Sequence, residues 1–207
     1  MGNFALGLGE PLGRTRHAGL RVENMENALV IGGTGMLRGV VLKLLEDSCQ
    51  VFVIARHRDA LHALQEEAGA AVERLTVMAM DYHDLERLGR WIAHIQLMHG
   101  PLDRVIAWVH DDAAAVLRVV DHEVYLYRRS PWNLFHVVGS RAAVDPPQLP
   151  TLSENCRYHQ VILGFIQESG SSRWLTHQEI VSGVYDAVKH PADFTVVGTV
   201  EPYENRP

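Results

Sequence analysis

The sequence predicts an α/β fold in which a doubly wound parallel sheet of about seven strands carries helices on both faces. Two observations lead to this prediction. Short apolar runs of strand length alternate with segments whose apolar residues recur at helical spacing. The first apolar run leads directly into a glycine-rich turn, which a helical pattern follows. Such alternation is typical of parallel sheets with right-handed crossovers.

The glycine-rich turn organises the first half of the chain. Residues 28–31 are apolar and read as a buried strand, and Val40, Val41, Leu44 and Leu45 continue the pattern as a helix. A strand, a glycine turn and a helix place a helix N-terminus beneath a phosphate group. The other interpretation is a plain structural turn. We expect cofactor contacts from Gly32, Gly33, Thr34, Gly35, Met36, Leu37 and Arg38.

A basic residue follows the second predicted strand, residues 50–55. Arg56 lies where an NAD-binding unit has an acidic residue for the ribose 2′-hydroxyl. A guanidinium can pair with a 2′-phosphate, which a carboxylate would repel, so Arg56 favours NADP over NAD. The alternative is a solvated basic cluster at the start of a helix. Asp59 is then expected to cap that helix.

The third and fourth strands are predicted at residues 75–80 and 105–109. Asp81 follows the third strand, where its carboxylate can accept from an adenine amino group or cap the next helix. Trp108 lies near the end of the fourth strand, where we place it in the cofactor site, and His110 follows the strand.

Composition narrows the class of protein. The 207 residues suit one domain, predicted at 28–207, and the formal charge of −6 argues against a nucleic-acid surface. No apolar run approaches membrane-spanning length. The two cysteines, Cys49 and Cys156, have no metal or redox spacing, which favours a reduced cytoplasmic setting.

Residues 1–27 differ from the rest because they show no apolar period. They lack the features of a secretory signal, and Leu6 stands where a myristoylation site needs Ser or Thr. We expect a disordered leader or a start codon assigned upstream of Met25; a functional arm is the alternative.

The segment from Ala28 to about Ser140 resembles the short-chain dehydrogenase/reductase family. The resemblance rests on the glycine turn, Arg56, Asp81, the entry at residues 100–103 to the fourth strand, and a fifth strand at residues 133–140. It implies a Rossmann fold with a nicotinamide cofactor at the carboxyl edge of the sheet. It also implies that Ser140, in the place of the family's serine, orients the substrate beside a Tyr-x-x-x-Lys pair that transfers the proton.

The sequence departs from the family pattern at three places. The third glycine of the fingerprint falls at Arg38, so either the helix packs less closely or Arg38 turns toward a phosphate; the nearest glycine is Gly39. Residues 108–110, Trp-Val-His, replace an Asn-Ala-Gly signature. No Tyr-x-x-x-Lys follows Ser140 soon, since Tyr185 and Lys189 come one element too late.

The last third of the chain adds three predicted elements. Residues 157–166 read as the sixth strand, and the prolines before it leave little room for a long helix. A helix is expected to start at residues 174–179, with Thr176 and Glu179 at capping-box spacing. The last strand is predicted at residues 194–200, where Pro202 stops it.

Three residues are candidates for proton transfer: Ser140, His110 and Tyr158. Each has a structural alternative: Ser140 as a loop start, His110 as a helix cap and Tyr158 as a packing residue. Tyr158 reaches the carboxyl edge only if its strand starts later than residue 157 or the proline-rich loop folds back. His136, inside a strand, is expected to be a hydrogen-bonded core histidine.

Two functions follow from these patterns. The first is an NADP(H)-dependent oxidoreductase with a non-standard proton donor and a small carbonyl-type substrate. The second is a non-catalytic NADP(H)-binding protein that senses the cofactor or scaffolds a partner. A homo-oligomer is compatible with either.

Overall fold

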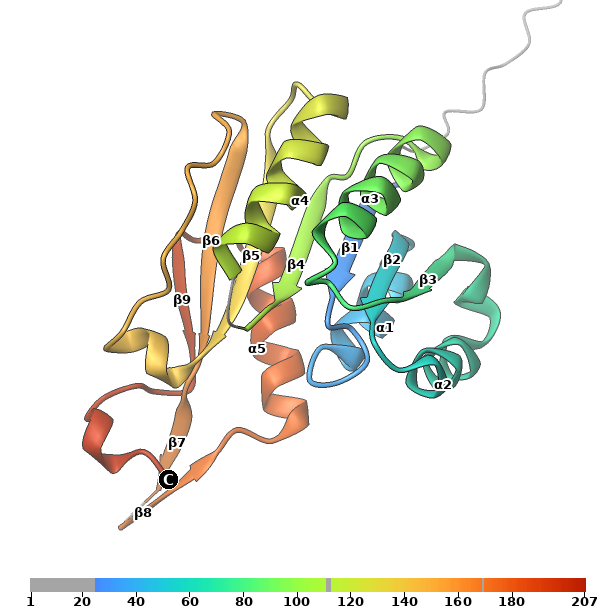
Figure 1. Cartoon of the computed structure of the whole chain (residues 1–207). Coiled ribbons are helices and arrows are strands. Elements are labelled where there is room, and N and C mark those ends of the chain that lie inside the picture. Colours follow the sequence, from blue (N-terminus) through green and yellow to red (C-terminus); the bar gives the residue numbers. More distant parts are fainter. Residues whose placement is uncertain (1–24, 111–112, 169) are drawn as a thin grey trace, which may run out of the picture.

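The computed structural model describes residues 25–110, 113–168 and 170–207, so most of the predicted leader lies outside the described residues. Seven parallel strands form one sheet in the order β3-β2-β1-β4-β5-β6-β9 (Figure 1). The strands are β1 Asn27–Ile31, β2 Gln50–Ala55, β3 Leu75–Ala79, β4 Arg104–Trp108, β5 Trp132–Gly139, β6 Cys156–Leu163 and β9 Phe194–Val197. The predicted doubly wound fold is confirmed.

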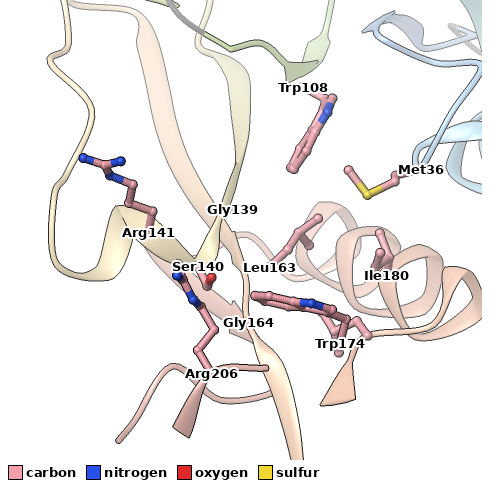
Figure 2. Close-up of a pocket in the computed structure, with 11 residues that line it drawn as sticks. Met36, Trp108, Gly139, Ser140, Arg141, Leu163, Gly164, Trp174, Ile180 and Arg206 are labelled. Carbon is pink, nitrogen blue, oxygen red and sulfur yellow. The ribbon is translucent and has the colours of Figure 1, made fainter. Parts of the chain in front are cut away.

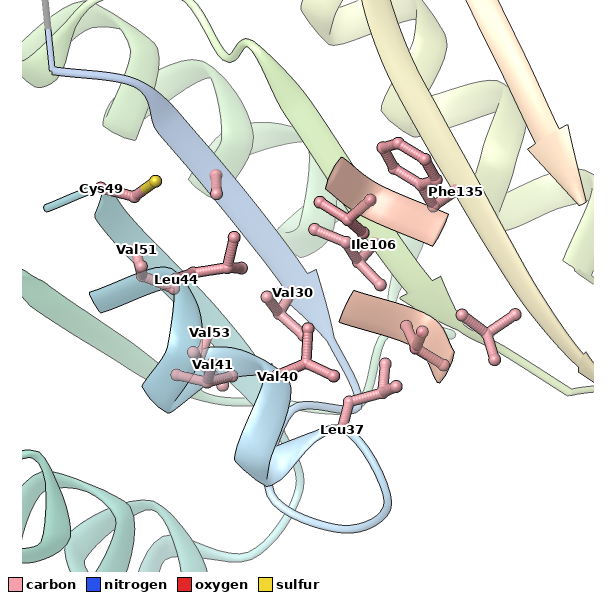
Figure 3. Packing of buried hydrophobic residues seen from close by; sticks show 14 of the residues in the cluster. Val30, Leu37, Val40, Val41, Leu44, Cys49, Val51, Val53, Ile106 and Phe135 are labelled. Carbon is pink, nitrogen blue, oxygen red and sulfur yellow. The ribbon is translucent and has the colours of Figure 1, made fainter. Parts of the chain in front are cut away.

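Helices cover both faces of this sheet. The helices are α1 Arg38–Glu46, α2 Arg58–Ala68, α3 Leu85–His99, α4 Ala113–Tyr127 and α5 His177–Lys189. Side chains of α1, α2 and α5 share one buried cluster with alternate residues of the strands (Figure 3). Side chains of α3 and α4 form the second cluster on the opposite face. Residues of β1 alternate between the two, with Val30 in the first cluster and Leu29 in the second, as expected for a strand covered on both sides.

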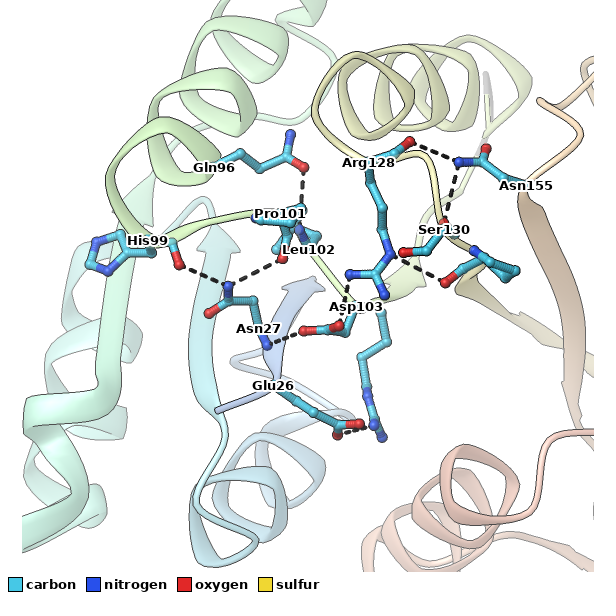
Figure 4. Close-up of polar contacts among 12 residues, drawn as sticks. Glu26, Asn27, Gln96, His99, Pro101, Leu102, Asp103, Arg128, Ser130 and Asn155 are labelled. Carbon is cyan, nitrogen blue, oxygen red and sulfur yellow. Dashed lines mark hydrogen bonds and ion pairs between the residues drawn. The ribbon is translucent and has the colours of Figure 1, made fainter. Parts of the chain in front are cut away.

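A polar network fixes the amino edge of the sheet (Figure 4). The Asn27 backbone N–H donates to the Asp103 carboxylate at 2.7 Å, and Arg128 binds the other oxygen of that carboxylate at 2.8 Å. Asn155 donates to the Arg128 backbone carbonyl at 2.8 Å. These bonds join the starts of β1, β4 and β6 to the segment after α4, so the amino edge is closed by the protein's own groups.

The connection from β5 to β6 contains one short 3₁₀ helix, Ser140–Ala143, followed by coil as far as Cys156. No long helix lies here within the described residues, in agreement with the three prolines of the segment. The Asp121 carboxylate of α4 accepts a hydrogen bond from the Ser153 backbone N–H at 2.8 Å, which fastens the end of this connection to α4.

The predicted sixth strand, residues 157–166, is wrong as one element because Gly164 divides it. A Cβ at Gly164 would lie 2.1 Å from the Thr199 carbonyl oxygen. Beyond this close approach the chain forms an antiparallel hairpin of β7 Phe165–Glu168 and β8 Ser171–Trp174. Trp174 therefore ends a strand and does not start a helix. The helix start lies at Thr176, whose capping box with Glu179 is confirmed.

The predicted cap of α2 is also wrong, and so is the second of the two interpretations of Asp81. His57 is the N-cap residue of α2, and Asp59 lies inside the first turn. Asp84 caps α3, where its side chain accepts from the Arg87 backbone N–H, so Asp81 does not perform that role. The last strand ends at Val197, three residues earlier than expected.

Candidate functional site

The glycine turn has the geometry of a phosphate-binding loop. Gly32 has a positive φ of 82°, and a Cβ there would lie 3.0 Å from the Trp108 carbonyl oxygen. A Cβ at Gly33 would lie 2.8 Å from a methyl group of Val53, so this glycine lets the turn pack on the sheet. Gly35 faces open space, and Thr34 beside it is half-buried. The turn thus leaves its outer side free for a ligand.

The helix that follows begins without a side-chain cap. The N-cap residue of α1, Leu37, makes no capping hydrogen bond, so backbone N–H groups of the first turn keep the positive end of the helix dipole open toward the turn. The Leu37 side chain is fully buried in the core, which limits its contribution to a ligand to backbone atoms.

Arg38, at the third glycine position, faces α2 in this structure. The Arg38 guanidinium pairs with Glu67 and donates to the Ala63 backbone carbonyl at 3.0 Å, both on α2. Gly39 is the residue of close packing, since a Cβ there would lie 2.7 Å from a methyl group of Val181 on α5. Gly39 therefore allows α1 to pack closely on α5.

Arg56 and Asp81 lie at neighbouring strand ends. Arg56 is exposed after β2 and forms no ion pair with a carboxylate in the described part of the chain. Asp81 accepts hydrogen bonds from the backbone and ring of His83, which lower its pKa, and the Arg56 charge lowers it further. The two residues thus follow adjacent strands at the carboxyl edge of the sheet.

A cavity of about 330 Å³ opens at the carboxyl ends of β4, β5 and β6 (Figure 2). It brings together two predicted cofactor residues, Met36 and Trp108, with the predicted catalytic Ser140. Ser140 is buried and follows β5 directly. Because these residues come from the glycine turn and two strand ends, the cavity lies where strands of a doubly wound sheet bind ligands.

His110 lies next to this cavity without lining it. Its ring packs edge-on against the Trp108 indole, with 4.7 Å between the ring centroids. Its backbone N–H donates to the Tyr82 hydroxyl at 3.3 Å. His110 is exposed, so one aromatic ring separates it from the centre of the cavity.

Tyr158 lies away from the carboxyl edge of the sheet. Because β6 starts at Cys156, Tyr158 lies near the beginning of this strand and therefore near the amino edge. Tyr158 pairs in register with Leu134 near the start of β5, and burial raises its pKa. Its hydroxyl lies 2.9 Å from Nδ1 of His136. The expectation that His136 is a hydrogen-bonded core histidine is confirmed.

His136 is also a buried titratable group in its own right. Burial, and then the charge of His110, lower its pKa to about 4. Its Nε2 has no hydrogen-bond partner among the described residues. The ring lines a second cavity of about 350 Å³ between α4 and the proline-rich connection. The sequence shows only a histidine within an apolar strand. It therefore could not predict that the ring of His136 lines this cavity.

The late Tyr-x-x-x-Lys pair belongs to the opposite end of the molecule. The Tyr185 hydroxyl donates to the Asp47 carboxylate at 2.8 Å, and the Lys189 ammonium binds the same oxygen at 3.1 Å. Asp47 follows the C-terminus of α1, so the pair joins α5 to α1 far from the cavity. Burial and Asp47 raise the pKa of Tyr185 to about 12.

Several residues of the cavity were not assigned to a site by the sequence-based prediction. Trp174 and Leu175 come from the end of the β7–β8 hairpin, Leu163 and Gly164 from the end of β6, and Arg206 from the segment after β9. Their convergence depends on the hairpin and on the return of the chain after β9, neither of which leaves a local signal in the sequence.

The described residues hold neither a metal-binding cluster nor a membrane-spanning helix. No cluster of His, Cys, Asp and Glu in them could hold a metal ion. None of the helices they form is both long and apolar enough to cross a membrane.

Comparison with solved structures identifies the architecture. A short-chain dehydrogenase/reductase from Mycobacterium marinum superposes with a TM-score of 0.67 at 14% identity, covering 86% of this chain and 95% of that one. The alcohol dehydrogenase of Thermococcus sibiricus, solved with 5-hydroxy-NADP, gives 0.64 at 13% identity, covering 84% and 96%. The fold is that of the short-chain dehydrogenases. No family model matches the sequence.

One characterised short-chain-dehydrogenase-like protein matches by sequence. It is the (S)-benzoin-forming benzil reductase of Saccharomyces cerevisiae, 32% identical over 80 residues. The match covers 36% of this chain and 30% of that reductase, so this chain spans less than a third of its relative.

Proposed function

We propose that this protein is an NADP(H)-dependent oxidoreductase that reduces a small carbonyl compound. The observation that carries the proposal is the cavity that joins Met36 of the glycine turn, Trp108 and Ser140 at the carboxyl edge of the sheet. The fold shared with short-chain dehydrogenases and the local match to a benzil reductase support the same reaction class.

The residues present fit a dinucleotide. The turn at residues 32–38 and the uncapped start of α1 would hold the pyrophosphate. Arg56 would pair with the 2′-phosphate and Asp81 would accept from the adenine amino group. Trp108 and Met36 would flank the nicotinamide end. When bound, the cofactor supplies the hydride.

The protein's own groups would orient the substrate and supply the proton. The Ser140 hydroxyl, inside the cavity, would donate a hydrogen bond to the substrate carbonyl oxygen. His110 lies outside the cavity beside Trp108, so it would deliver the proton that this oxygen takes up through a bridging water. Tyr158 takes no part in this reaction, because its place in β6 keeps it away from the cavity and its partner His136 lines the second cavity.

The alternative is a non-catalytic NADP(H) sensor or scaffold. One observation favours it: in the described residues, neither Tyr158 nor the Tyr185–Lys189 pair lines the cavity. The phenol that donates the proton in the related family thus has no counterpart there.

The experiment compares Ser140→Ala and His110→Ala with the parent in NADPH-linked turnover of a panel of aldehydes, ketones and imines. We expect each variant to lower turnover, by roughly 10²–10⁴ where it removes the acid–base group, with little change in NADP affinity. Tyr185→Phe is the matched control, since its hydroxyl donates to Asp47 and, among the described residues, makes no other hydrogen bond. If both variants keep the parental rate, the catalytic site lies elsewhere. If the parent binds NADPH tightly and reduces nothing, the sensor function is the better explanation.

A further inference from the structure

We infer that the cavity selects a 2-oxo acid with an aromatic or large apolar side chain, whose carboxylate is bound by Arg206. This inference rests on the proposed function and specifies its substrate class. In the reaction, the carbonyl carbon receives the hydride, its oxygen receives one proton, NADPH is oxidised to NADP⁺, and a 2-hydroxy acid is released.

The cavity is small and mostly apolar. Its volume of about 330 Å³ is at the lower end for small-molecule sites, which suits a compact substrate. Trp108, Leu163, Trp174, Leu175 and Ile180 make most of its wall apolar. Two indole rings can contact an aromatic or branched side chain over a large area at little entropic cost.

One end of the cavity is positively charged. The charged residues that line the cavity are two arginines, Arg141 and Arg206. Arg141 already pairs with Asp145 at 3.1 Å. Arg206 forms no ion pair with any carboxylate in the part of the chain that the structure describes. An anion is therefore favoured here, and Arg206 is the cation available to bind it.

Aromatic contacts hold the Arg206 side chain in place. One of its nitrogens donates to the Tyr203 hydroxyl at 2.7 Å. The guanidinium lies 4.9 Å from the Tyr203 ring centre and 6.0 Å from that of Trp174. Stacking fixes the plane of a guanidinium and leaves donors for a two-pronged contact with a carboxylate.

Arg206 and Ser140 lie close enough in the cavity to bind neighbouring groups of one substrate. Both line the same cavity, and Figure 2 places them at one end, with Met36 and Trp108 toward the other. In a 2-oxo acid the carbonyl and the carboxylate are on adjacent carbons. Ser140 and Arg206 can therefore hold one group each while the side chain faces the indoles.

The test uses benzoylformate and its methyl ester, which differ in one charge and one methyl group. Binding of each is measured by calorimetry on the full chain with saturating NADP⁺, after NADPH binding has been established by fluorescence. We expect the acid to bind at least about 10-fold more tightly than the ester. Arg206→Gln should weaken acid binding about 10-fold, the lower end for a charge-assisted contact because Arg206 is exposed, and change ester binding less than about 2-fold.

Arg129→Gln is the matched control. Arg129 also stacks on a tyrosine, at 4.6 Å from the Tyr125 ring centre, but it lies after α4 and does not line the cavity. It should leave the binding of both compounds unchanged. In turnover, Arg206→Gln should raise KM for benzoylformate and leave kcat near the parental value.

Three results would overturn this inference: equal binding of acid and ester, equal effects of the two arginine variants, or binding of neither compound by protein that binds NADPH. Failure to bind NADPH would instead overturn the proposed function. Since the calorimetric titration of acid and ester is repeated without cofactor, the two failures remain distinguishable.

Discussion

Acidification should destabilise the fold through His136. Burial lowers the pKa of this histidine from 6.5 to about 4, so the folded state resists a proton that the unfolded chain accepts. The contribution to stability is fully present above pH 6.5 and is lost as the pH falls from 6.5 to about 4. The difference between the two pKa values corresponds to roughly 3 kcal/mol, of which about 2.5 kcal/mol is lost by pH 4.5.

Urea unfolding at pH 7.5, 6.5, 5.5 and 4.5 measures this loss. The variant His136→Gln retains a side chain that can accept from the Tyr158 hydroxyl but does not titrate. Its stability at pH 7.5 should be lower than the parent's, yet it should fall less steeply between pH 6.5 and 4.5. The difference between the two slopes, not the absolute stability, isolates the histidine.

His122→Gln is the control, because His122 is exposed on α4 and should not alter the slope. The carboxylates with lowered pKa, such as Glu179 with a pKa of about 2, begin to lose their contribution near pH 4.5; because the parent and His136→Gln share this loss, it cancels in the difference between the two slopes. Parallel stability curves for the parent and His136→Gln would show that burial does not hold His136 neutral.

Three further predictions concern the cofactor, the leader and the late Tyr-x-x-x-Lys pair. Arg56→Ala should weaken NADP binding roughly 10–100-fold and leave NAD binding nearly unchanged, because a charge-assisted contact contributes about 1.5–3 kcal/mol; calorimetry showing equal losses for both cofactors would reject the assignment. A chain that starts at Met25 should keep its Tm within a few degrees and bind cofactor normally, since β1 starts only at Asn27; a large drop in either would mean that the leader packs on the domain. Tyr185→Phe combined with Lys189→Met should leave NADPH affinity unchanged. It should cost about 1 kcal/mol of stability or less in urea unfolding, because the contacts of these two side chains with Asp47 are largely exposed; a loss of cofactor affinity would contradict the structural role.

The first five strands and the helices between them were predictable because each depends on its own residues. Buried strands of a parallel sheet are continuous apolar runs, and Leu88 and Ile92 of α3 lie on the buried side of an ordinary helical pattern. Ser140 was predictable as well, since its place follows from the end of a strand. The observed strands differ from the predicted ones mainly by one residue at an end.

The remainder depends on contacts between distant parts of the chain. Gly164 interrupts an apolar run because of the Thr199 carbonyl, and no local pattern marks that approach. Asp81 and Asp84 both precede α3 and both can cap a helix, so only the backbone path decides between them. Arg206 enters the cavity because the chain returns after β9, which makes it invisible to motif reasoning.

The close approach at Gly164 has a mechanical consequence for the cavity. Phe165 and Thr199 exchange two backbone hydrogen bonds, at 2.9 and 2.8 Å, and a Cβ at Gly198 would lie 2.6 Å from the Phe165 carbonyl oxygen. The β7–β8 hairpin, which carries Trp174, is thereby hydrogen-bonded to the segment after β9, which leads to Arg206. We therefore expect Trp174 and Arg206 to move together whenever this side of the cavity opens.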